Sequence, residues 1–180
     1  MLKKSVLQIA LATVLFSTSV IVHAASLTTS LPVTATVAQN CQISTTTAIA
    51  FGAYDPVGAN ALTALNTSGQ ISIACAKKSV GLTIGMDDGA HVSGTQRQML
   101  GAVNADNLQY NLYQPPSNTP NAACSFPGTV AWNATGVGLL SLASPTSKAA
   151  NLYNVCATIP AGQDISVDSY TDTIIATINF

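Results

Sequence analysis

Residues Tyr170–Phe180, YTDTIIATINF, alternate between apolar and polar side chains. Ile174, Ala176, Ile178 and Phe180 fall on one face of an extended chain, and Ile175 is the one exception on the other. A period of two is typical of a half-buried strand, so the pattern predicts a β-strand over residues 170–180. The sequence offers no further strand after it, and we therefore expect an edge that needs pairing by another chain.

The first 24 residues have the organisation of a secretory leader. Lys3 and Lys4 form a charged start, residues 6–20 form a short apolar run, and Val22-His23-Ala24 supplies small residues before a cleavage point at Ala25. The apolar run is short and no basic stop signal follows it, which disfavours a membrane anchor. We therefore expect a chain secreted into an oxidising compartment.

The sequence after the leader alternates like the last eleven residues. One face carries Leu27, Thr29, Leu31 and Val33, followed by Ala35 and Val37. Pro32 interrupts the run, because proline cannot donate to a strand ladder and belongs at a strand start or on an edge. We interpret residues 25–32 as a free donor segment, and we predict that the domain covers residues 33–180 and opens with a strand over residues 33–41.

The composition excludes several kinds of partner. Six basic residues oppose seven acidic ones in 180 residues, and loss of Lys3 and Lys4 with the leader leaves a net charge of about −3. Nucleic-acid binding requires clustered Lys and Arg, which are absent from the sequence. A polybasic patch for an anionic membrane surface is absent as well. A nearly neutral surface of Thr, Ser, Asn and Gln is suited to lateral packing in an assembly.

The four cysteines all follow the leader, and an even number in an exported chain predicts disulfides. Four cysteines allow three pairings, of which we favour Cys41–Cys75 and Cys124–Cys156. Each bridge then closes a loop of a little over thirty residues, worth roughly 4 kcal/mol in the chain-entropy model. Without a C-x-x-C spacing or a His-rich tract, neither a metal site nor a cofactor is expected.

The middle of the chain reads as short strands separated by turns. Alternation predicts strands over residues 69–76, 80–86, 107–113, 128–132 and 153–159, with a turn at Asp87-Asp88-Gly89. With the two ends, seven short strands favour an antiparallel sandwich over a barrel.

Residues that suggest chemistry have simpler interpretations. Asp87, Asp88 and His91 offer an acid–base group, but an Asp-Asp-Gly hairpin turn explains them without catalysis. Trp132 offers a sugar platform, but a core or interface position is more common. Arg97 is interpreted as bonded to a loop carbonyl or an aspartate. We predict no catalytic residues and no enzyme activity.

Three segments together resemble the spore coat protein U domain family. They are Ile159–Asp164 with the 170–180 strand, Gly85–Gly89 followed by 97–100 and 108–113, and Phe51-Gly52 between Cys41 and Cys75. The resemblance covers essentially all of the chain after the leader. This family includes subunits of archaic, Csu-type chaperone–usher pili as well as secreted coat proteins.

The resemblance implies an incomplete immunoglobulin-like antiparallel sandwich that lacks its last strand. Its partners would be a periplasmic chaperone that lends a strand, an outer-membrane usher, and a neighbouring subunit whose N-terminal segment replaces the chaperone strand. On this sequence, the acceptor groove would be flanked by Ile174, Ala176, Ile178 and Phe180. The groove would be filled by Leu27 and Leu31 of another chain, with Thr29 between them and Val33 beyond.

The function expected from this resemblance is that of a structural pilus subunit, a shaft or adaptor, at the cell surface, supporting adhesion and biofilm formation. The alternative is a secreted, free-standing coat-like or binding module that completes its own fold. The position of Pro32 directly before the predicted domain strand favours donation to a neighbour.

Overall fold

The structure is a computed structural model that describes residues 24–180. The predicted leader lies outside the described residues except for Ala24. The chain divides into two units, Met1–Thr36 and Val37–Phe180. In the first unit, the described residues 24–36 form neither helix nor strand, and their side chains are exposed. Within the described part of the chain, no helix has the length and apolar character needed to span a bilayer.

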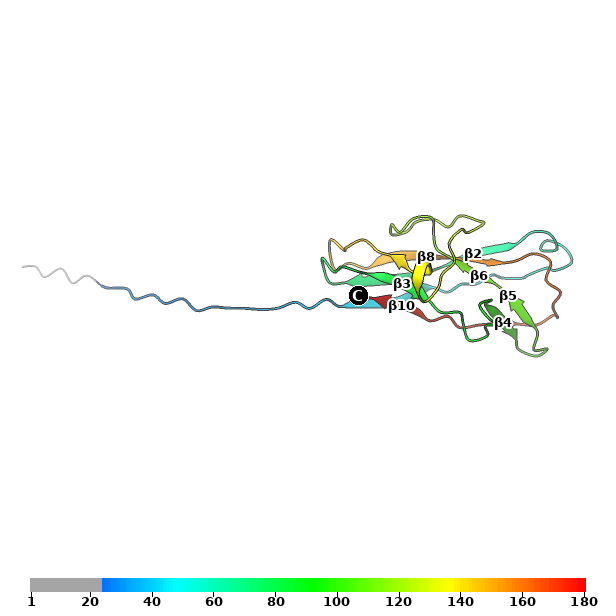
Figure 1. The fold of residues 1–180 in the computed structure, drawn as a ribbon, viewed down its shortest axis with the longest axis horizontal. Helices are drawn as coiled ribbons and strands as arrows, with labels where there is room; N and C mark the ends of the chain where they lie inside the picture. The colour runs from blue at the N-terminus through cyan, green and yellow to red at the C-terminus, as the bar shows by residue number, and fades with distance from the viewer. Residues whose placement is uncertain (1–23) are drawn as a thin grey trace, which may run out of the picture. The chain divides into compact units, whose positions relative to one another are not determined.

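The second unit is built from short strands, which confirms the predicted all-β fold (Figure 1). The described residues contain one 3-10 turn, η1 (Gly136–Gly138), and ten strands. In chain order the strands are β1 (Cys41–Thr47), β2 (Leu65–Cys75), β3 (Thr83–Met86), β4 (Gln98–Gly101), β5 (Asn107–Gln109), β6 (Asn111–Tyr113), β7 (Leu140–Ser141), β8 (Asn151–Ile159), β9 (Tyr170–Thr171) and β10 (Ala176–Asn179).

The strands form three antiparallel sheets that share one core. Their orders are β1-β2-β8-β6, β10-β3-β7 and β5-β4-β9. Alternate side chains of β2, β3 and β8 enter a single buried cluster, with Ile71, Ile84 and Val155 at most 5% exposed. Side chains from facing sheets therefore interdigitate, as in a sandwich of the predicted immunoglobulin-like kind.

The predicted strand over residues 33–41 is wrong for residues 33–40. Residues 24–40 form no strand, and the side chains of Val33 and Val37 are 90% and 88% exposed. Alternation alone predicted the strand, but a ladder also needs a partner. In the described structure, β2 is the partner of β1 only from Cys41, which lies opposite Cys75.

Three other predicted strands are shorter or divided. The segment 107–113 changes sheets at Tyr110, because β5 pairs with β4 whereas β6 pairs with β8. The predicted 80–86 strand begins only at Thr83, because positive φ angles of 65° at Lys78 and 70° at Gly81 turn the chain just before it. Residues 128–132 contribute one isolated bridge, between Ala131 and Tyr113.

The predicted terminal strand is interrupted. Its ends are β9, which pairs with β4, and β10, which pairs with β3. Residues 172–175 between them belong to no ladder. The inward and outward alternation continues through the interruption, since Ile174 is half-buried and Ile175 is 59% exposed.

Two disulfides join the four cysteines in the favoured pairing. Cys41–Cys75 links β1 to β2, and Cys124–Cys156 links the long loop after β6 to β8. The sequence separations are 34 and 32 residues. Both bridges thus tie non-local segments to the central strands β2 and β8.

Candidate functional site

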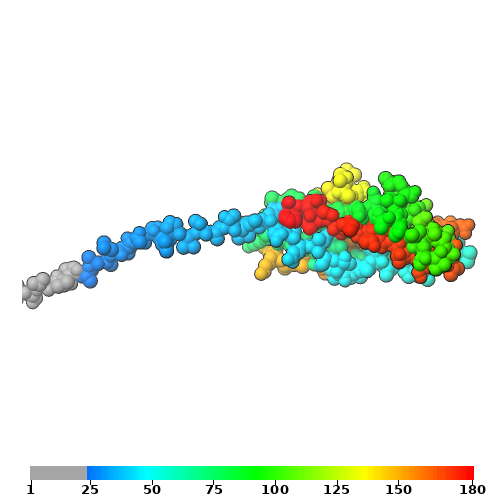
Figure 2. Space-filling view, turned by 90° about the horizontal axis from the view of Figure 1, so that it is seen from below, coloured from blue at the N-terminus to red at the C-terminus, as the bar shows by residue number. Residues whose placement is uncertain are grey.

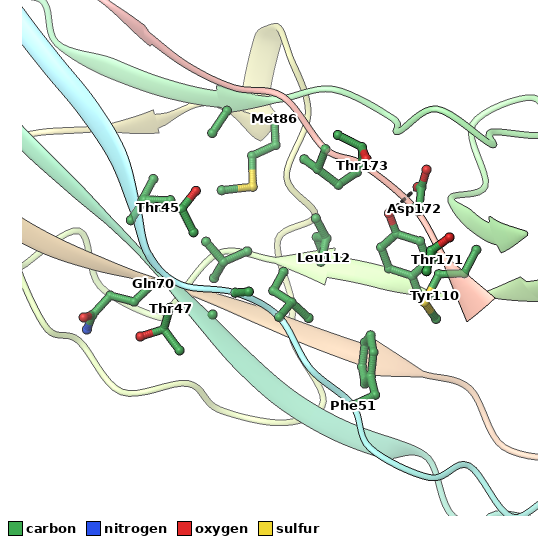
Figure 3. Close-up of a pocket in the computed structure, with 18 of the residues that line it drawn as sticks. Thr45, Thr47, Phe51, Gln70, Met86, Tyr110, Leu112, Thr171, Asp172 and Thr173 are labelled. Atoms are coloured by element: carbon green, nitrogen blue, oxygen red, sulfur yellow. Dashed lines mark hydrogen bonds between the residues drawn. The ribbon is translucent and has the colours of Figure 1, made fainter. Parts of the chain in front are cut away.

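An apolar groove of about 400 Å³ opens between β1 and the terminal segment that carries β9 and β10 (Figure 3). Thr45 and Thr47 of β1 lie on one wall, and residues 170–174 lie on the other. Met86 and Leu112 lie between the walls and form part of the floor (Figure 3). The floor belongs to the buried core, so the groove reaches from the surface down to core side chains.

Each of the three sheets has an edge strand at this groove. β1 is the edge of the first sheet, β10 of the second and β9 of the third, and all three contribute lining residues. An edge strand carries backbone N–H and C=O groups without ladder partners. The groove therefore combines apolar side chains on its floor with unpaired backbone on its walls, which is the chemistry that accepts an extended peptide.

A second cavity of about 520 Å³ adjoins the first. The two have four lining residues in common: Ile49, Phe51, Met99 and Tyr170. Beyond these, the second cavity is lined by Ala50, residues 52–54 and Pro56, by residues 165–169, and by Leu108 and Ile159. The two cavities therefore lie next to each other, and we refer to the pair as the depression.

The four predicted acceptor residues occupy different positions. Ile174 and Ala176 line the first cavity. Ile178 is half-buried and packs against the core beside β3, outside the cavity lining. Phe180 follows the last paired residue of β10 and is 54% exposed. In the space-filling view the terminal segment runs as a band along the surface of the domain (Figure 2).

The carboxylate of Asp172 is the one charged group that lines the first cavity. It is only 1% exposed. Its Oδ1 accepts hydrogen bonds from the backbone N–H groups of Ala90 and His91, and Nδ1 of His91 lies 3.1 Å away. The Tyr110 hydroxyl donates to Oδ2 over 2.6 Å. Burial, together with this hydrogen bond, raises the pKa of Tyr110, so that the hydroxyl remains a donor.

Asp87, in the predicted turn, also binds the terminal segment that forms this wall. Asp87 Oδ1 accepts hydrogen bonds from the N–H groups of Gly89 and Ile175. Asp87 and Asp172 thus bind each other's chain segments reciprocally. Sequence reasoning missed Asp172, although a carboxylate on the apolar face of a predicted strand was a usable signal.

Arg97 and Trp132 are structural, as the sequence analysis expected. Arg97 is 5% exposed and donates to the carbonyls of Met86, Asp87 and Trp132. Trp132 is fully buried in the core. Within residues 24–180, no three His, Cys, Asp or Glu side chains are grouped as a metal would require.

The predicted donor residues lie in the other unit of the chain. Leu27, Leu31 and Val33 are at least 83% exposed, and Thr29 is exposed as well. They form no helix or strand.

Three comparisons with known proteins are informative. Residues 27–177 match the family model of the Spore Coat Protein U domain. Protein U of Myxococcus xanthus is 31% identical over 140 residues, which are 72% of this chain and 70% of that protein. A solved structure, the CsuC-CsuE chaperone–tip adhesion subunit pre-assembly complex from archaic chaperone-usher Csu pili of Acinetobacter baumannii, contains a chain with 19% identity and a TM-score of 0.46. That match covers 81% of this chain and 41% of the solved one.

Proposed function

Because the chain belongs to the Spore Coat Protein U domain family, we propose that it is a structural subunit of a surface pilus, polymerised by exchange of donor strands. The observation that carries the proposal is the meeting of three sheet edges at one apolar groove. An extended segment laid in that groove pairs with the walls and covers the floor in a single step.

The donor in this proposal is the segment 25–32 of a neighbouring copy. Leu27 and Leu31 are exposed in the described chain and are the right kind of side chain for a floor of Met86, Leu112 and Val155. Full burial of one aliphatic side chain stabilises by roughly 1.5–3 kcal/mol. Two such side chains and a backbone ladder give a joint that is slow to open, which provides kinetic stability.

The other partners in this proposal are the proteins that export the subunit. An uncovered groove in a free subunit is an aggregation hazard, so a periplasmic chaperone covers it until an outer-membrane usher exchanges the chaperone's strand for the neighbour's donor. The two disulfides support passage through an oxidising periplasm. We place the mature protein at the cell surface, where the filament supports adhesion and biofilm formation.

The direct test is an SDS gel of material sheared from the cell surface, run unheated and boiled, with an antibody to this chain. Strand-exchanged polymers give a ladder in the unheated lane that collapses to one band on boiling. A single monomer band in both lanes would refute polymerisation by strand exchange.

The donor assignment is tested by Leu31→Asp, with Ser30→Asp as the matched control on the opposite face. A charge at residue 31 would have to be buried in the apolar groove, so the ladder should be lost. Ser30→Asp adds the same charge to the same segment and should assemble normally. Normal polymers from Leu31→Asp would contradict the donor assignment.

A second candidate is a secreted, free-standing coat-like or binding module. The description of the matching family and its member Protein U favour it. Such a module completes its own groove, and it would give the monomer result on the same gel.

A further inference from the structure

We propose that the donor extends past Pro32 to Val37, and that its second half fills the second cavity of a neighbouring copy of this chain. The inference rests on the proposed strand exchange and deepens it. It assigns the donor six inward positions in place of the predicted three or four. These are Leu27, Thr29, Leu31, Val33, Ala35 and Val37.

The first observation is where the chain becomes fixed to its own domain. The side chain of Gln39 donates to the carbonyl of Val80 over 2.9 Å and accepts from the N–H of Val80 over 3.2 Å. The carbonyl of Asn40 accepts from Ala76 at 2.9 Å. Residues 24–36 belong to a separate unit, and Val37, the first residue of the domain unit, is 88% exposed. The domain is thus tethered from Gln39 onward, which leaves residues 33–37 available for donation.

The second observation is that these residues continue the donor pattern without a change of phase. Val33 and Val37 are 90% and 88% exposed and lie on the same face of an extended chain as Leu27 and Leu31. Two exposed valines on a polar segment cost free energy in water unless a partner buries them. Pro32 lacks one N–H for the ladder but falls on the outward face, so the inward row is uninterrupted.

The third observation is the length of the depression. The lining residues of the two cavities run from 45 to 56 on one wall and from 165 to 176 on the other, about twelve residues each. At roughly 3.3 Å per residue, a donor of residues 25–32 reaches about 26 Å, whereas a donor of residues 25–37 reaches about 43 Å. By residue count, the longer segment of thirteen residues corresponds to walls of about twelve residues, whereas the shorter segment of eight does not.

The second cavity has the chemistry for an aliphatic donor. Residues 48–54, on one wall, make no backbone–backbone hydrogen bond in the described structure. The Ala50 carbonyl accepts from the Thr67 hydroxyl, and the other peptide groups of this wall are available for pairing. Leu108, Ile159 and Ile165 provide an apolar lining. The one charged lining group, Asp168, already accepts from Val103 and Asn104. Residues 24–38 carry no Asp, Glu, Lys or Arg, so donor and cavity bring no unpaired charge together.

The experiment compares two inward and two outward substitutions in residues 33–37, the second half of the proposed donor, with Leu31→Asp as the reference. Val33→Asp and Val37→Asp are expected to reduce SDS-resistant multimers by about tenfold or more, since a charge would enter an apolar cavity. Thr34→Asp and Thr36→Asp are the matched controls and should assemble like the wild type. Val37→Ile retains the aliphatic shape and should assemble as well.

The outcomes separate this inference from the proposed function. If Leu31→Asp blocks assembly while Val33→Asp and Val37→Asp assemble normally, the extension is wrong and the shorter donor stands. If Leu31→Asp also assembles normally, the proposed strand exchange itself fails. If the Thr34→Asp and Thr36→Asp controls are blocked as severely as the inward variants, the assignment of faces is overturned. Normal yield of soluble, disulfide-bonded subunit in periplasmic extracts excludes loss of the folded subunit as the cause.

Discussion

At the scale of single residues, Asp172 fixes the wall of the groove. Its buried carboxylate binds the β3–β4 connection through Ala90 and His91 and the floor through Tyr110. A buried charge is costly unless hydrogen bonds satisfy it, and here two backbone N–H groups and the Tyr110 hydroxyl donate to it, with Nδ1 of His91 3.1 Å away. The interruption between β9 and β10 therefore follows from a polar anchor at the place where the chain leaves one sheet for another.

Tyr110→Phe tests this anchor. The variant removes one donor to a charged acceptor and should lower the free energy of unfolding by about 1.5–3 kcal/mol, measured by denaturant titration. The matched control is Tyr113→Phe, because the Tyr113 hydroxyl makes no hydrogen bond in the described structure. Equal stability of the two variants would mean that the Tyr110–Asp172 bond contributes nothing.

The local stability of the second cavity around Asp168 should depend on pH. Hydrogen bonds from the backbone N–H groups of Asn104 and Val103 lower the pKa of Asp168 below its ordinary value of 3.8. The stabilisation is therefore complete above that value and is lost as the pH falls through the lower pKa of the folded state. Hydrogen exchange at Val103 and Asn104 should accelerate in that acidic window, and Asp168→Asn should remove the dependence. Exchange that is independent of pH beyond the intrinsic chemical rate would contradict this role.

At the level of secondary-structure elements, the sequence predicts best those strands that have a neighbouring strand on each side. β2 and β8 pair over nine residues and were expected from their alternation. The strand over residues 33–41 was predicted from the same kind of pattern and is absent before Cys41. A periodic pattern identifies a face that can be buried, but the partner decides whether a ladder forms, and that partner can be another chain.

The groove was only partly predictable for the same reason. Ile174 and Ala176 were expected in it, and they line it. The opposite wall, residues 48–56, has no clear periodicity and becomes visible only when β1 and the terminal segment are placed together. The switch of sheets at Tyr110 was equally hidden, because the alternation of residues 107–113 is continuous through it.

The two disulfides offer a matched test of what the edge strand β1 contributes. Their loops are similar in length, so Cys41→Ser/Cys75→Ser and Cys124→Ser/Cys156→Ser should each lower the free energy of unfolding by roughly 3–4 kcal/mol. Only the first bridge holds an edge of the groove. At a temperature where both variants remain folded, the Cys41/Cys75 variant should incorporate more slowly into polymers. Equal incorporation of the two variants would show that the Cys41–Cys75 bridge does not help the groove to accept a donor. Four free thiols in the wild type, measured by mass spectrometry, would show that neither bridge forms.

At the scale of the whole molecule, the scarcity of charge defines how copies can associate. The donor segment carries no charged side chain, and the charged lining groups of the depression, Asp172 and Asp168, are satisfied within the subunit. Association then depends on apolar burial and backbone pairing, which salt does not screen. A filament of such subunits should be insensitive to ionic strength.

Purified polymers test this expectation. Release of subunits should be unchanged between about 0.1 M and about 1 M sodium chloride, although the Debye length falls from about 10 Å to about 3 Å. Urea at several molar should accelerate release, because it solvates both apolar and peptide groups. Sulfate should slow release, because it strengthens apolar burial. Release that rises about tenfold in sodium chloride would show that ion pairs hold the subunits together, and would point to a contact other than the groove.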